Sequence, residues 1–458
     1  MPRAAEQDRG TVVRPVVDLE KLMSSSSYVS DPGRVRALAK DIAEKRLSPV
    51  ELVGRYLSRI AETDPHVQCW RVVDGERALA TAAEREREAS AGLLRGSLHG
   101  IPVAVKDIID AEGLPTRANS RSRADIMPAT ADAEVVLALK SQGAIVLGKV
   151  HTTEFAFFDP SPARNPHNLA HTPGGSSSGS AASVAAGMAP IAIGTQTVAS
   201  VNRPAAYCGI AAFKPSSRSL STFGITPLAP SYDTAGFYGW SVDDAALAFE
   251  AAAPISMRAD AVKMDAGPLS IAIPEDAHLG DAIPDMKAAH QRIADGFARA
   301  GHRVERGPSP IPFTRLFELQ RSTMLFETGG ALRYLLDAPQ GSVGEKLLGA
   351  IRDGLAIPLS RYLDERAEID RMRRTFFAET STDLFLWPAA PGTAPEGLGW
   401  TGDPKYIAPW TALGEPIVTM PAGKAANGLP LGVIVAARPG QDARMCTWAR
   451  RLAEGIGS

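Results

Sequence analysis

The pattern of hydrophobic and polar positions along the chain predicts a mixture of amphipathic helices and buried strands. Two amphipathic helices are expected after an N-terminal arm, and the second has a clear start. Ser48 as N-cap, Pro49 at the first helical position and Glu51 two residues later form a capping box before an apolar face. A third, charged helix is expected over residues 75–91. The N-terminal part of the chain is therefore predicted to be helical.

Short apolar runs bounded by Gly and Pro come next, and such runs are typical of buried strands. The first is Gly100–Val105, and a helix over residues 131–142 and a strand over 144–147 follow it, so a βα alternation begins here. Further strands are expected at residues 384–387, 417–420 and 431–436. We expect an α/β fold with a single large mixed, mostly parallel β-sheet core surrounded by helices.

Composition narrows the class of protein. The 458 residues are 45% hydrophobic and 22% charged, as in soluble globular proteins, and 49 Lys and Arg against 51 Asp and Glu give a net charge of −2. A chain so close to neutral lacks the basic footprint of a nucleic-acid binder. The most apolar stretch, residues 181–194, is shorter than the roughly 20 residues of a membrane span. We expect a soluble protein with neither nucleic-acid nor membrane partners.

Cysteine content and the N-terminus indicate a cytoplasmic protein. The three cysteines are too few and too far apart for a disulfide framework or a zinc site, and the N-terminus lacks the apolar core of a signal peptide. Residues 1–32 are expected to form a flexible arm, and residues 33–458 a single domain. Residues 165–236 are rich in Gly, Ser and Ala but lack the charge of a linker, which indicates backbone packed tightly inside a core.

Three motifs suggest chemistry but lack the residues that would complete it. Residues 143–149 match the start of a phosphate-binding P-loop, but Val150 stands where that motif needs Ser or Thr. Residues 175–179 fit the nucleophile elbow G-x-S-x-G around Ser177, but no histidine in the C-terminal region completes a Ser-His-Asp triad. No second cluster with metal-ligand spacing accompanies the His-x-x-Glu pair at residues 151–154. Neither a metal nor a cofactor is therefore expected.

Longer segments carry a more specific signal. They are GIPVAVKD at 100–107, GKVHTTEFA at 148–156, NPHNLAHTPGGSSSGSAASVAAGM at 165–188, GTQTVASVNRPAAYCGIAAFKPS at 194–216 and TGDPKYIAPWTALGEPIVTMP at 401–421. Through them the chain closely resembles the amidase signature family of serine hydrolases, and within it malonamidase-like bacterial enzymes. The resemblance spans about residues 34–455. It implies a signature core at about 100–240, a variable substrate-pocket region at about 258–385, and hydrolysis of C–N bonds by a Ser-cisSer-Lys triad.

The resemblance implies that the triad is Lys106, Ser176 and Ser200, with Ser176 on a cis peptide bond and Ser200 as the nucleophile. These residue types suit the chemistry, because a serine hydroxyl needs a base and a lysine can be that base only if burial keeps it neutral. Ser176 would relay the proton between the other two. Asp107 is adjacent to the lysine, but consecutive strand residues point to opposite faces, so it need not re-protonate Lys106.

The resemblance also implies an oxyanion hole formed by the backbone N–H groups of Thr197, Val198, Ala199 and Ser200. The family's usual pair before the nucleophile is Gly-Gly, and this chain has Val198-Ala199 instead. The Cβ atoms of this pair are expected to crowd the turn. Either the turn is distorted, or the acyl pocket is reshaped.

Four further residues are expected to bind substrate or to support the triad. Arg203, three residues past the nucleophile, corresponds to an Arg that holds a substrate carboxylate in malonamidase-like relatives, and the alternative is that structural acceptors satisfy it. Gln196 replaces the Asp that is usual in the family, a feature that malonamidase-like members share. Ser178 and Thr195 are expected to support the triad or to fill ordinary hydrogen-bond roles.

The expected function is hydrolysis of small amides or carbamates through an acyl-enzyme or carbamoyl-enzyme on Ser200. Two alternatives stay open: a broad-specificity urethane, ester or aryl-amide hydrolase with a bulky pocket, and a weakly active structural subunit of an amidohydrolase complex. The residues expected to wall the pocket are Phe313, Leu316, Phe317, Met324 and Phe326. The expected partner is the small-molecule substrate, and a homodimer stays open.

Overall fold

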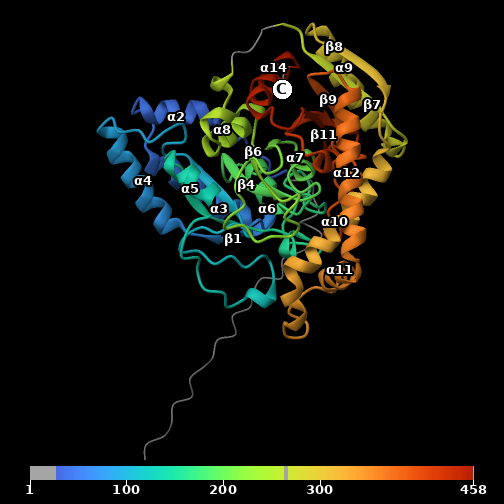
Figure 1. Ribbon diagram of the computed structural model, residues 1–458. Helices are drawn as coiled ribbons and strands as arrows, with labels where there is room; N and C mark the ends of the chain where they lie inside the picture. Colours follow the sequence, from blue (N-terminus) through green and yellow to red (C-terminus); the bar gives the residue numbers. More distant parts are fainter. Residues whose placement is uncertain (1–26, 263–266, 457–458) are drawn as a thin grey trace, which may run out of the picture.

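One sheet of eleven strands organises the computed structural model, which describes residues 27–262 and 267–456 (Figure 1). The strands are β1 (Trp70–Val73), β2 (Pro102–Lys106), β3 (Ile145–Val150), β4 (Ile191–Gln196), β5 (Ala211–Lys214), β6 (Thr234–Gly239), β7 (Ser270–Glu275), β8 (Arg303–Pro308), β9 (Leu384–Pro388), β10 (Ile417–Lys424) and β11 (Pro430–Ala436). They lie side by side in the order β1-β3-β2-β4-β6-β5-β10-β11-β9-β7-β8. Most of the predicted arm, residues 1–26, lies outside the described residues.

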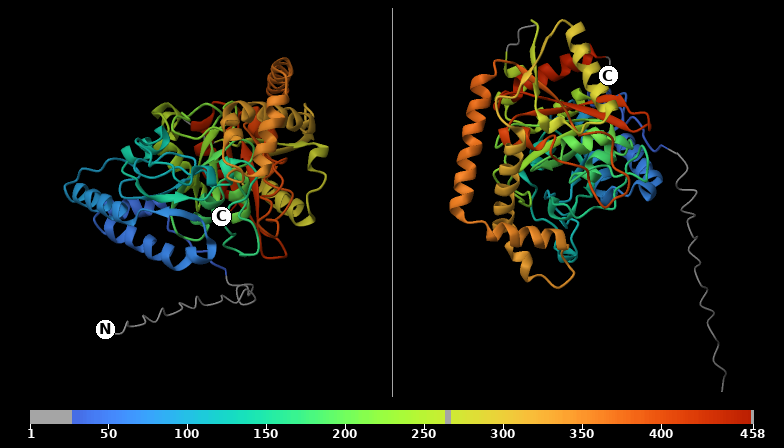
Figure 2. Two further views of the ribbon diagram at one scale, coloured as in Figure 1. Left: turned by 90° about the horizontal axis from the view of Figure 1, so that it is seen from below. Right: turned by 90° about the vertical axis from the view of Figure 1, so that its right-hand side faces the viewer.

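Helices surround this sheet. Within the described residues they are α2 (Val35–Ala43), α3 (Pro49–Val67), α4 (Gly75–Ser90), α5 (Glu134–Ser141), α6 (Ser178–Ala185), α7 (Asn202–Cys208), α8 (Val242–Ala252), α9 (Pro284–Arg299), α10 (Phe313–Leu332), α11 (Glu345–Ala356), α12 (Leu359–Glu379), α13 (Ala408–Leu413) and α14 (Asp442–Gly455). Figures 1 and 2 show α2–α4 gathered on one side of the molecule and α10–α12 on the opposite side. The two groups of helices flank the central strands.

The sheet is single and mixed, as expected, but the expectation of mostly parallel pairing was wrong. Four neighbouring pairs are parallel, β3–β2, β2–β4, β9–β7 and β7–β8, and the other six pairs are antiparallel. β10 and β11 show the physical reason. Residues 425–429 join them without a helix, and so short a connection pairs consecutive strands antiparallel. Parallel pairing is confined to two groups of strands on either side of an antiparallel centre.

The predicted helices and strands are confirmed to within a few residues. Strands β2, β3, β9, β10 and β11 and helices α4 and α5 cover the predicted segments. Ser48 is the N-cap of α3, and its Oγ accepts hydrogen bonds from the N–H groups of Val50 and Glu51 at 3.1 and 3.2 Å. The Glu51 carboxylate accepts a hydrogen bond from Arg55 one turn later instead of closing the predicted capping box.

Both faces of the central strands are covered closely. A Cβ atom on Gly239 of β6 would lie 2.5 Å from the backbone nitrogen of Ala245 on α8. A Cβ atom on Gly236 would lie 2.6 Å from a methyl group of Val201, just before α7. Residues three apart in a strand face opposite sides of the sheet. Helix α8 therefore covers one face, and the segment that leads into α7 covers the other.

The Gly/Ser/Ala-rich segment is buried as predicted over most of residues 171–216, whereas residues 217–224 are exposed or half-buried. Every residue of α6, β4 and α7 is buried. A Cβ atom on Gly179 would lie 2.5 Å from the carbonyl oxygen of Cys69 and 2.5 Å from the backbone nitrogen of His151. Small residues are needed here because the backbones touch. This packing brings the loop before α6 against the end of β4, where Ser177 Oγ donates to the Thr195 carbonyl oxygen at 3.1 Å.

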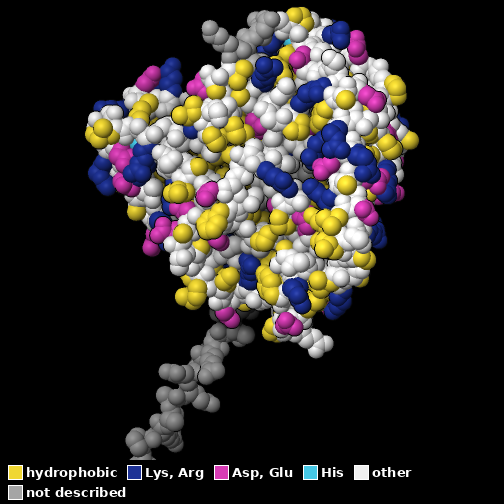
Figure 3. All heavy atoms as spheres, in the orientation of Figure 1, with side chains coloured by type: hydrophobic (Ala, Val, Ile, Leu, Met, Phe, Trp, Pro, Cys, Tyr) yellow, Lys and Arg dark blue, Asp and Glu magenta, His cyan; other side chains and the backbone are white. Residues whose placement is uncertain are grey.

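The surface matches the near-neutral charge of the chain. Positive and negative side chains both occur across the face shown in Figure 3. No helix in the described part of the chain combines the length and apolar character needed to cross a bilayer. The three cysteines, Cys69, Cys208 and Cys446, are free and buried.

Candidate active site

Lys106 is the last residue of β2 and lies in the middle of a polar cluster. β2 pairs in parallel with β3 and β4, so the carboxyl ends of three strands meet at one edge. Lys106 Nζ lies 2.8 Å from Ser176 Oγ and 2.8 Å from Thr195 Oγ1 near the end of β4. The side chain is fully buried, and burial lowers its pKa well below the ordinary value, with the charge of Asp233 opposing the shift. A neutral amine that can accept a proton is therefore favoured.

Asp107 points away from this cluster, as predicted. Its carboxylate lies 3.3 Å from Lys149 Nζ on β3, and both side chains are fully buried. The same carboxylate accepts a hydrogen bond from the Arg117 N–H at 3.2 Å. Asp107 is thus engaged on the other side of the strand end, and it does not hold a proton on Lys106.

Ser176 lies in the loop that leads into α6, and the peptide bond between Gly175 and Ser176 is cis, as the resemblance implies. Hydrogen bonds hold the backbone on both sides of this bond. Arg203 Nη2 donates to the Gly175 carbonyl oxygen at 2.7 Å. The Ser176 carbonyl oxygen accepts from the N–H groups of Thr153 at 3.0 Å and Ser178 at 2.8 Å. Ser178 therefore supports Ser176 through the backbone, and its hydroxyl lies 3.4 Å from the same oxygen.

Ser200 lies between β4 and α7, beside the loop of Ser176. The Ser177 N–H donates to the Ser200 carbonyl oxygen at 3.4 Å, and the Tyr238 hydroxyl donates to the same oxygen at 3.0 Å. The residue is 9% exposed and lines a narrow passage in the interior. The fold therefore brings Lys106 and Ser176 into contact and places the backbone of Ser200 beside the loop of Ser176, although the three residues lie in separate parts of the sequence.

Residues 197–200, called here the oxyanion loop, have all four carbonyl oxygens hydrogen-bonded. The donors are Gln320 Nε2 to Thr197 at 3.1 Å, Thr411 Oγ1 to Val198 at 2.6 Å, Arg203 N–H to Ala199 at 3.0 Å and Tyr238 Oη to Ser200 at 3.0 Å. The N–H groups differ: no described residue accepts a hydrogen bond from the N–H of Thr197, Val198, Ala199 or Ser200. The four predicted donors thus have no protein acceptor, and an oxyanion hole requires such donors.

The Val198-Ala199 pair fits the turn without left-handed backbone. Neither residue has a positive φ. Ala199 is buried, whereas Val198 is half-buried, and both line the passage to Ser200. Of the two expected consequences of losing Gly-Gly, a reshaped acyl pocket agrees with these observations and a left-handed, strained turn does not.

Asp233 is a half-buried residue that sequence reasoning missed. Its Oδ1 accepts a hydrogen bond from Thr197 Oγ1 at 2.6 Å, and its Oδ2 accepts from the N–H groups of Leu228 and Ala229 at 2.8 and 3.1 Å. Burial raises the pKa of Asp233, and these three hydrogen bonds oppose the rise. Asp233 ties the oxyanion loop to the neighbouring loop, and no motif in the sequence marks it.

Gln196, the last residue of β4, hydrogen-bonds the backbone that follows the oxyanion loop. Its Oε1 accepts from the N–H groups of Val201 and Asn202 at 2.8 and 3.0 Å. Its Nε2 donates to Thr411 Oγ1 and Asn202 Oδ1, both at 2.9 Å. These contacts make it a supporting residue. Sequence reasoning missed Thr411 and Gln320, although Thr411 lies in the last of the segments that carry the resemblance.

Arg203 is engaged by structural acceptors. Its Nη1 donates to the Gly402 carbonyl oxygen at 2.5 Å, and its Nη2 donates to the Gly175 carbonyl oxygen at 2.7 Å and to Thr401 Oγ1 at 3.0 Å. The side chain is 3% exposed, and burial lowers its pKa. Its Nε has no hydrogen-bond partner in the described part of the chain. These contacts agree with the structural alternative, although Arg203 also borders the passage to Ser200.

A passage and a larger cavity lead to Ser200. The passage has a volume of about 20 Å³ and is lined mainly by apolar side chains, including Leu228. The cavity outside it has a volume of about 480 Å³. The two share Phe157, Phe158, Val198, Met324 and Pro404, so they lie next to each other. Phe317 and Trp400 extend the apolar wall of the outer cavity, and charged residues of α10 and α11 form its rim.

The expected pocket wall is confirmed in part. Phe317 and Met324 line the outer cavity. Phe313 instead packs against Trp387 and Trp410 in the core, with ring centroids 5.1 and 5.3 Å apart. Leu316 is fully buried in the same core, and Phe326 stacks on Tyr362. A helix has only one face toward a cavity, and the sequence does not show which apolar face of α10 that is.

In the motifs that suggested other chemistry, the key side chains make structural contacts. Ser177 is fully buried, and its hydroxyl both donates to and accepts from the backbone of Thr195. Most of the P-loop-like segment is strand β3, and its Lys149 pairs with Asp107. Among the described residues, no group of three or more His, Cys, Asp or Glu side chains is placed to hold a metal.

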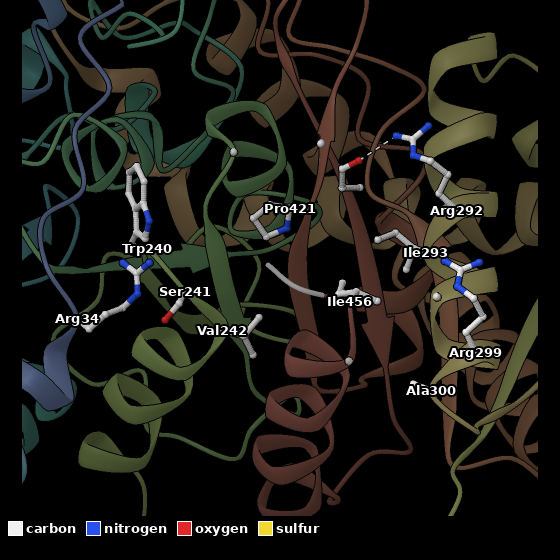
Figure 4. Close-up of a pocket in the computed structure, with 15 residues that line it drawn as sticks. Arg34, Trp240, Ser241, Val242, Arg292, Ile293, Arg299, Ala300, Pro421 and Ile456 are labelled. Carbon is white, nitrogen blue, oxygen red and sulfur yellow. Dashed lines mark hydrogen bonds between the residues drawn. The ribbon is translucent and has the colours of Figure 1, made fainter.

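Another cavity, of about 740 Å³, is bordered by residues of α8, α9, β10 and α14 (Figure 4). Arg292 and Arg299 of α9 lie on one side of it, and Arg34 and Trp240 lie on the other. Arg292 Nη2 donates to the Ala422 carbonyl oxygen at 3.3 Å. The residues that line this cavity include none of those predicted for the active site.

The family model described as Amidase matches residues 51–446, so the chain belongs to the amidase family, the amidase signature family that its motifs resemble. AmiA2 of Mycobacterium tuberculosis is 32% identical over 450 residues, which cover 90% of this chain and 91% of that protein. A glutamyl-tRNA(Gln) amidotransferase subunit of Anaeromyxobacter dehalogenans is 32% identical, covering 92% of this chain and 96% of that protein. The peptide amidase from Stenotrophomonas maltophilia has a similar structure, with a TM-score of 0.78 at 27% identity, covering 93% and 97% of the two chains.

Proposed function

We propose that the protein hydrolyses the C–N bond of small neutral amides or carbamates through an acyl-enzyme on Ser200. The observation that carries the proposal is the fully buried Lys106, whose Nζ lies 2.8 Å from Ser176 Oγ beside the loop of Ser200. Burial lowers the pKa of this amine well below its ordinary value, which favours the neutral form that can accept a proton. A serine next to such a base can be activated as a nucleophile.

The proposed steps use the triad and the oxyanion loop. Lys106 takes the proton of Ser176 while Ser176 takes the proton of Ser200, and Ser200 Oγ attacks the carbonyl carbon. The carbonyl oxygen becomes an alkoxide, which the N–H groups of Thr197, Val198, Ala199 and Ser200 stabilise. As the C–N bond breaks, the proton returns through Ser176 to the leaving nitrogen, and the acyl group stays on Ser200. Water then attacks this ester, passes a proton along the same route and releases the acid.

A neutral substrate with an apolar acyl or aryl group suits the approach to Ser200. Phe157, Phe158, Val198 and Met324 line both the narrow passage and the outer cavity. A cavity of about 480 Å³ is within the range of small-molecule sites. Esters and urethanes with such groups have the same shape, so activity on them belongs to the same proposal.

A malonamidase-like specificity, for an amide that also carries a carboxylate, is the narrower alternative. It would rest on Gln196 and Arg203. Gln196 supports the oxyanion loop, which any substrate of this mechanism would need. Arg203 already donates three hydrogen bonds to Gly402, Gly175 and Thr401. Three of the five N–H donors of the guanidinium are thus engaged by the protein, which favours a neutral substrate over a dicarboxylic half-amide.

A structural subunit with weak activity is the second candidate. The similarity to a glutamyl-tRNA(Gln) amidotransferase subunit over most of the chain favours it. The unpartnered N–H groups of the oxyanion loop and the buried lysine beside Ser176 favour a working hydrolase instead.

A hydrolysis panel tests the proposal. Malonamate, aliphatic amides, anilides, p-nitrophenyl esters and aryl carbamates are assayed with wild type, Ser200→Ala and Lys106→Ala. We expect wild-type turnover of neutral amides or carbamates that both variants lose, and a fluorophosphonate probe that labels wild type but not Ser200→Ala. Activity that survives in Ser200→Ala would contradict the proposal. A wild-type protein that neither turns over the panel nor reacts with the probe would favour the structural subunit.

We further propose a cytoplasmic location, because Cys69, Cys208 and Cys446 are all free thiols. The small-molecule substrate is the proposed partner.

A further inference from the structure

We propose that Gln320 and Thr411 are positioning residues that set the direction of the N–H groups in the oxyanion loop. The inference rests on the proposed function, because only a reaction with a developing alkoxide gives those N–H groups a task. Neither residue lies near the loop in sequence: Gln320 is on α10 and Thr411 is on α13. Each reaches one peptide group of the loop through its side chain.

The two contacts are made to consecutive carbonyl oxygens. Gln320 Nε2 donates to the Thr197 carbonyl oxygen at 3.1 Å, and Thr411 Oγ1 donates to the Val198 carbonyl oxygen at 2.6 Å. Both side chains are buried, with exposed fractions of 0% for Gln320 and 1% for Thr411. Buried hydrogen bonds of this kind are costly to break, because the carbonyl oxygen would be left without water or another donor.

The planarity of the peptide bond converts these contacts into control of the N–H groups. In a trans peptide the C=O and N–H bonds of one plane point in opposite directions. The peptide bonds of the loop are trans, since the cis bond found in the described residues is the one between Gly175 and Ser176. Gln320, by holding the Thr197 carbonyl, therefore directs the N–H of Val198 to the other side. Thr411, by holding the Val198 carbonyl, directs the N–H of Ala199 in the same way.

The hydrogen-bond network leaves Thr411 one direction for its proton. Gln196 Nε2 donates to Thr411 Oγ1 at 2.9 Å, so the hydroxyl acts as an acceptor toward Gln196 and as a donor toward the Val198 carbonyl oxygen. The other end of Gln196 is occupied by the N–H groups of Val201 and Asn202. The network of Thr411 and Gln196 therefore contacts the oxyanion loop at Val198 and the residues that follow the loop.

The orientation of Gln320 is fixed by the same reasoning. The Thr197 carbonyl oxygen can only accept, so the amide nitrogen of Gln320 must face it, and its Oε1 has no hydrogen-bond partner among the described residues. Gln320 shares α10 with Phe317 and Met324, which line the substrate cavity. The wall of the cavity and the oxyanion loop are thus linked through one side chain, so a substrate that seats against α10 meets correctly directed N–H groups.

The test compares Gln320→Met and Thr411→Val with Thr411→Ser, which restores the hydroxyl, and with Thr328→Val as a control. Thr328 is a fully buried threonine on α10 whose Oγ1 has no partner among the described residues, so its loss removes a hydroxyl without touching the loop. kcat and KM are measured on one neutral anilide hydrolysed by wild type. Binding is measured for an aryl boronic acid, which forms a tetrahedral adduct with the nucleophile, and for an unreactive amide analogue.

We expect kcat to fall about 10- to 100-fold in Gln320→Met and Thr411→Val, somewhat less than the loss of a whole oxyanion donor. KM and the affinity for the unreactive analogue should stay near wild type, while the affinity for the boronic acid falls with kcat. Thr411→Ser should recover most of the activity, and Thr328→Val should match wild type.

Three results overturn the inference. The first is kcat near wild type in both variants while Ser200→Ala is inactive. The second is an equal loss of affinity for the boronic acid and the unreactive analogue, and the third is an equal loss of kcat in Thr328→Val, because general damage to the fold would then explain the data. Wild-type turnover in Ser200→Ala would instead overturn the proposed function on which the inference rests.

Discussion

Lys106 and Thr195 meet side chain to side chain across the parallel strands β2 and β4, with Nζ and Oγ1 2.8 Å apart. The second neighbour of this amine is Ser176 Oγ, also at 2.8 Å. Two hydroxyl groups can hydrogen-bond a neutral amine as well as a charged one, and they bring no negative charge that would favour the ammonium form. The direct partners of Lys106 therefore allow burial to dominate its protonation state.

The lowered pKa of Lys106 leads to the first prediction. The neutral amine is the active form, so kcat/KM should rise with pH as Lys106 loses its proton and level off below the ordinary lysine pKa of about 10.4. Lys106→Met should lower kcat/KM by about 10²- to 10⁴-fold, the usual contribution of a general base. Initial rates across pH on a neutral anilide check both points. A profile that keeps rising beyond pH 10 would contradict the role of burial.

Arg203 provides the second prediction, on Arg203→Gln. Its guanidinium donates to Gly402, Gly175 and Thr401, and removal leaves buried acceptors unpaired, which typically costs about 1–3 kcal/mol each. We expect lower stability in urea unfolding and lower kcat on every substrate. The ratio of kcat/KM for malonamate to that for a neutral amide should not change. Arg374→Gln, at an exposed position on α12, serves as the control. A selective loss of malonamate hydrolysis would show that Arg203 binds a carboxylate.

Asp233 provides the third prediction, on Asp233→Asn. The negative charge of Asp233 favours the protonated form of Lys106 and so raises its pKa. Removing that charge should lower the pKa of Lys106 further, and the acidic limb of the kcat/KM profile should move to lower pH. Stability should fall as well, because the Asp233 carboxylate accepts hydrogen bonds from three donors and an amide cannot accept from all of them. If the acidic limb of the kcat/KM profile stays in place or moves to higher pH, the charge of Asp233 does not raise the pKa of Lys106.

The sequence was a good guide to the local elements. Capping residues and apolar runs predicted α3 and five strands, because those signals act over a few neighbouring residues. Lys106, Ser176 and Ser200 could be put forward as a triad because each lies in a long segment that resembles a family, and their catalytic roles stay a prediction. The order of the strands was not predictable in this way, since pairings such as β5 with β10 join residues about 200 positions apart.

The residues that sequence reasoning missed share a physical character. Gln320, Thr411 and Asp233 are polar residues that act on the backbone of another element. A single glutamine on α10 has no diagnostic spacing, and its role depends on how that helix packs against the oxyanion loop. Contacts of this kind, from a side chain to the backbone of another element, can be found only once the tertiary structure brings the elements together.

Glu415 provides the fourth prediction, which concerns stability. The side chain is fully buried, and neither carboxylate oxygen has a hydrogen-bond partner among the described residues. Burial raises its pKa well above the ordinary value, with Lys214, Arg373 and Arg438 opposing the shift. The folded state therefore holds a proton that the unfolded chain releases above about pH 4.3. The stability from this group is fully present below that pH and is lost as pH rises toward the raised pKa.

The measurement for this prediction is urea unfolding of wild type and Glu415→Gln at pH 5 and pH 7.5. The variant should gain stability relative to wild type as pH rises, because it has no proton to lose. Lys214 has the opposite sign, since burial lowers its pKa to about 8, and its contribution appears only above that pH. Glu396→Gln, at an exposed position, is the matched control and should follow wild type. Equal pH dependence in Glu415→Gln and wild type would contradict the prediction.

Val198 provides the last prediction, because it lines both the passage at Ser200 and the outer cavity. Val198→Gly removes the isopropyl group from the wall next to Ser200, so larger acyl groups should fit. Pocket changes of this size alter discrimination by about 10- to 200-fold. We expect the ratio of kcat/KM for a phenylacetyl anilide to that for an acetyl anilide to rise about 10-fold or more. Ala199→Gly, at the buried neighbouring position, should change the substrate range less than Val198→Gly does. Its effect on the substrate range should still exceed its effect on stability. An unchanged ratio across an acyl-chain series in Val198→Gly would show that this side chain does not shape the acyl pocket.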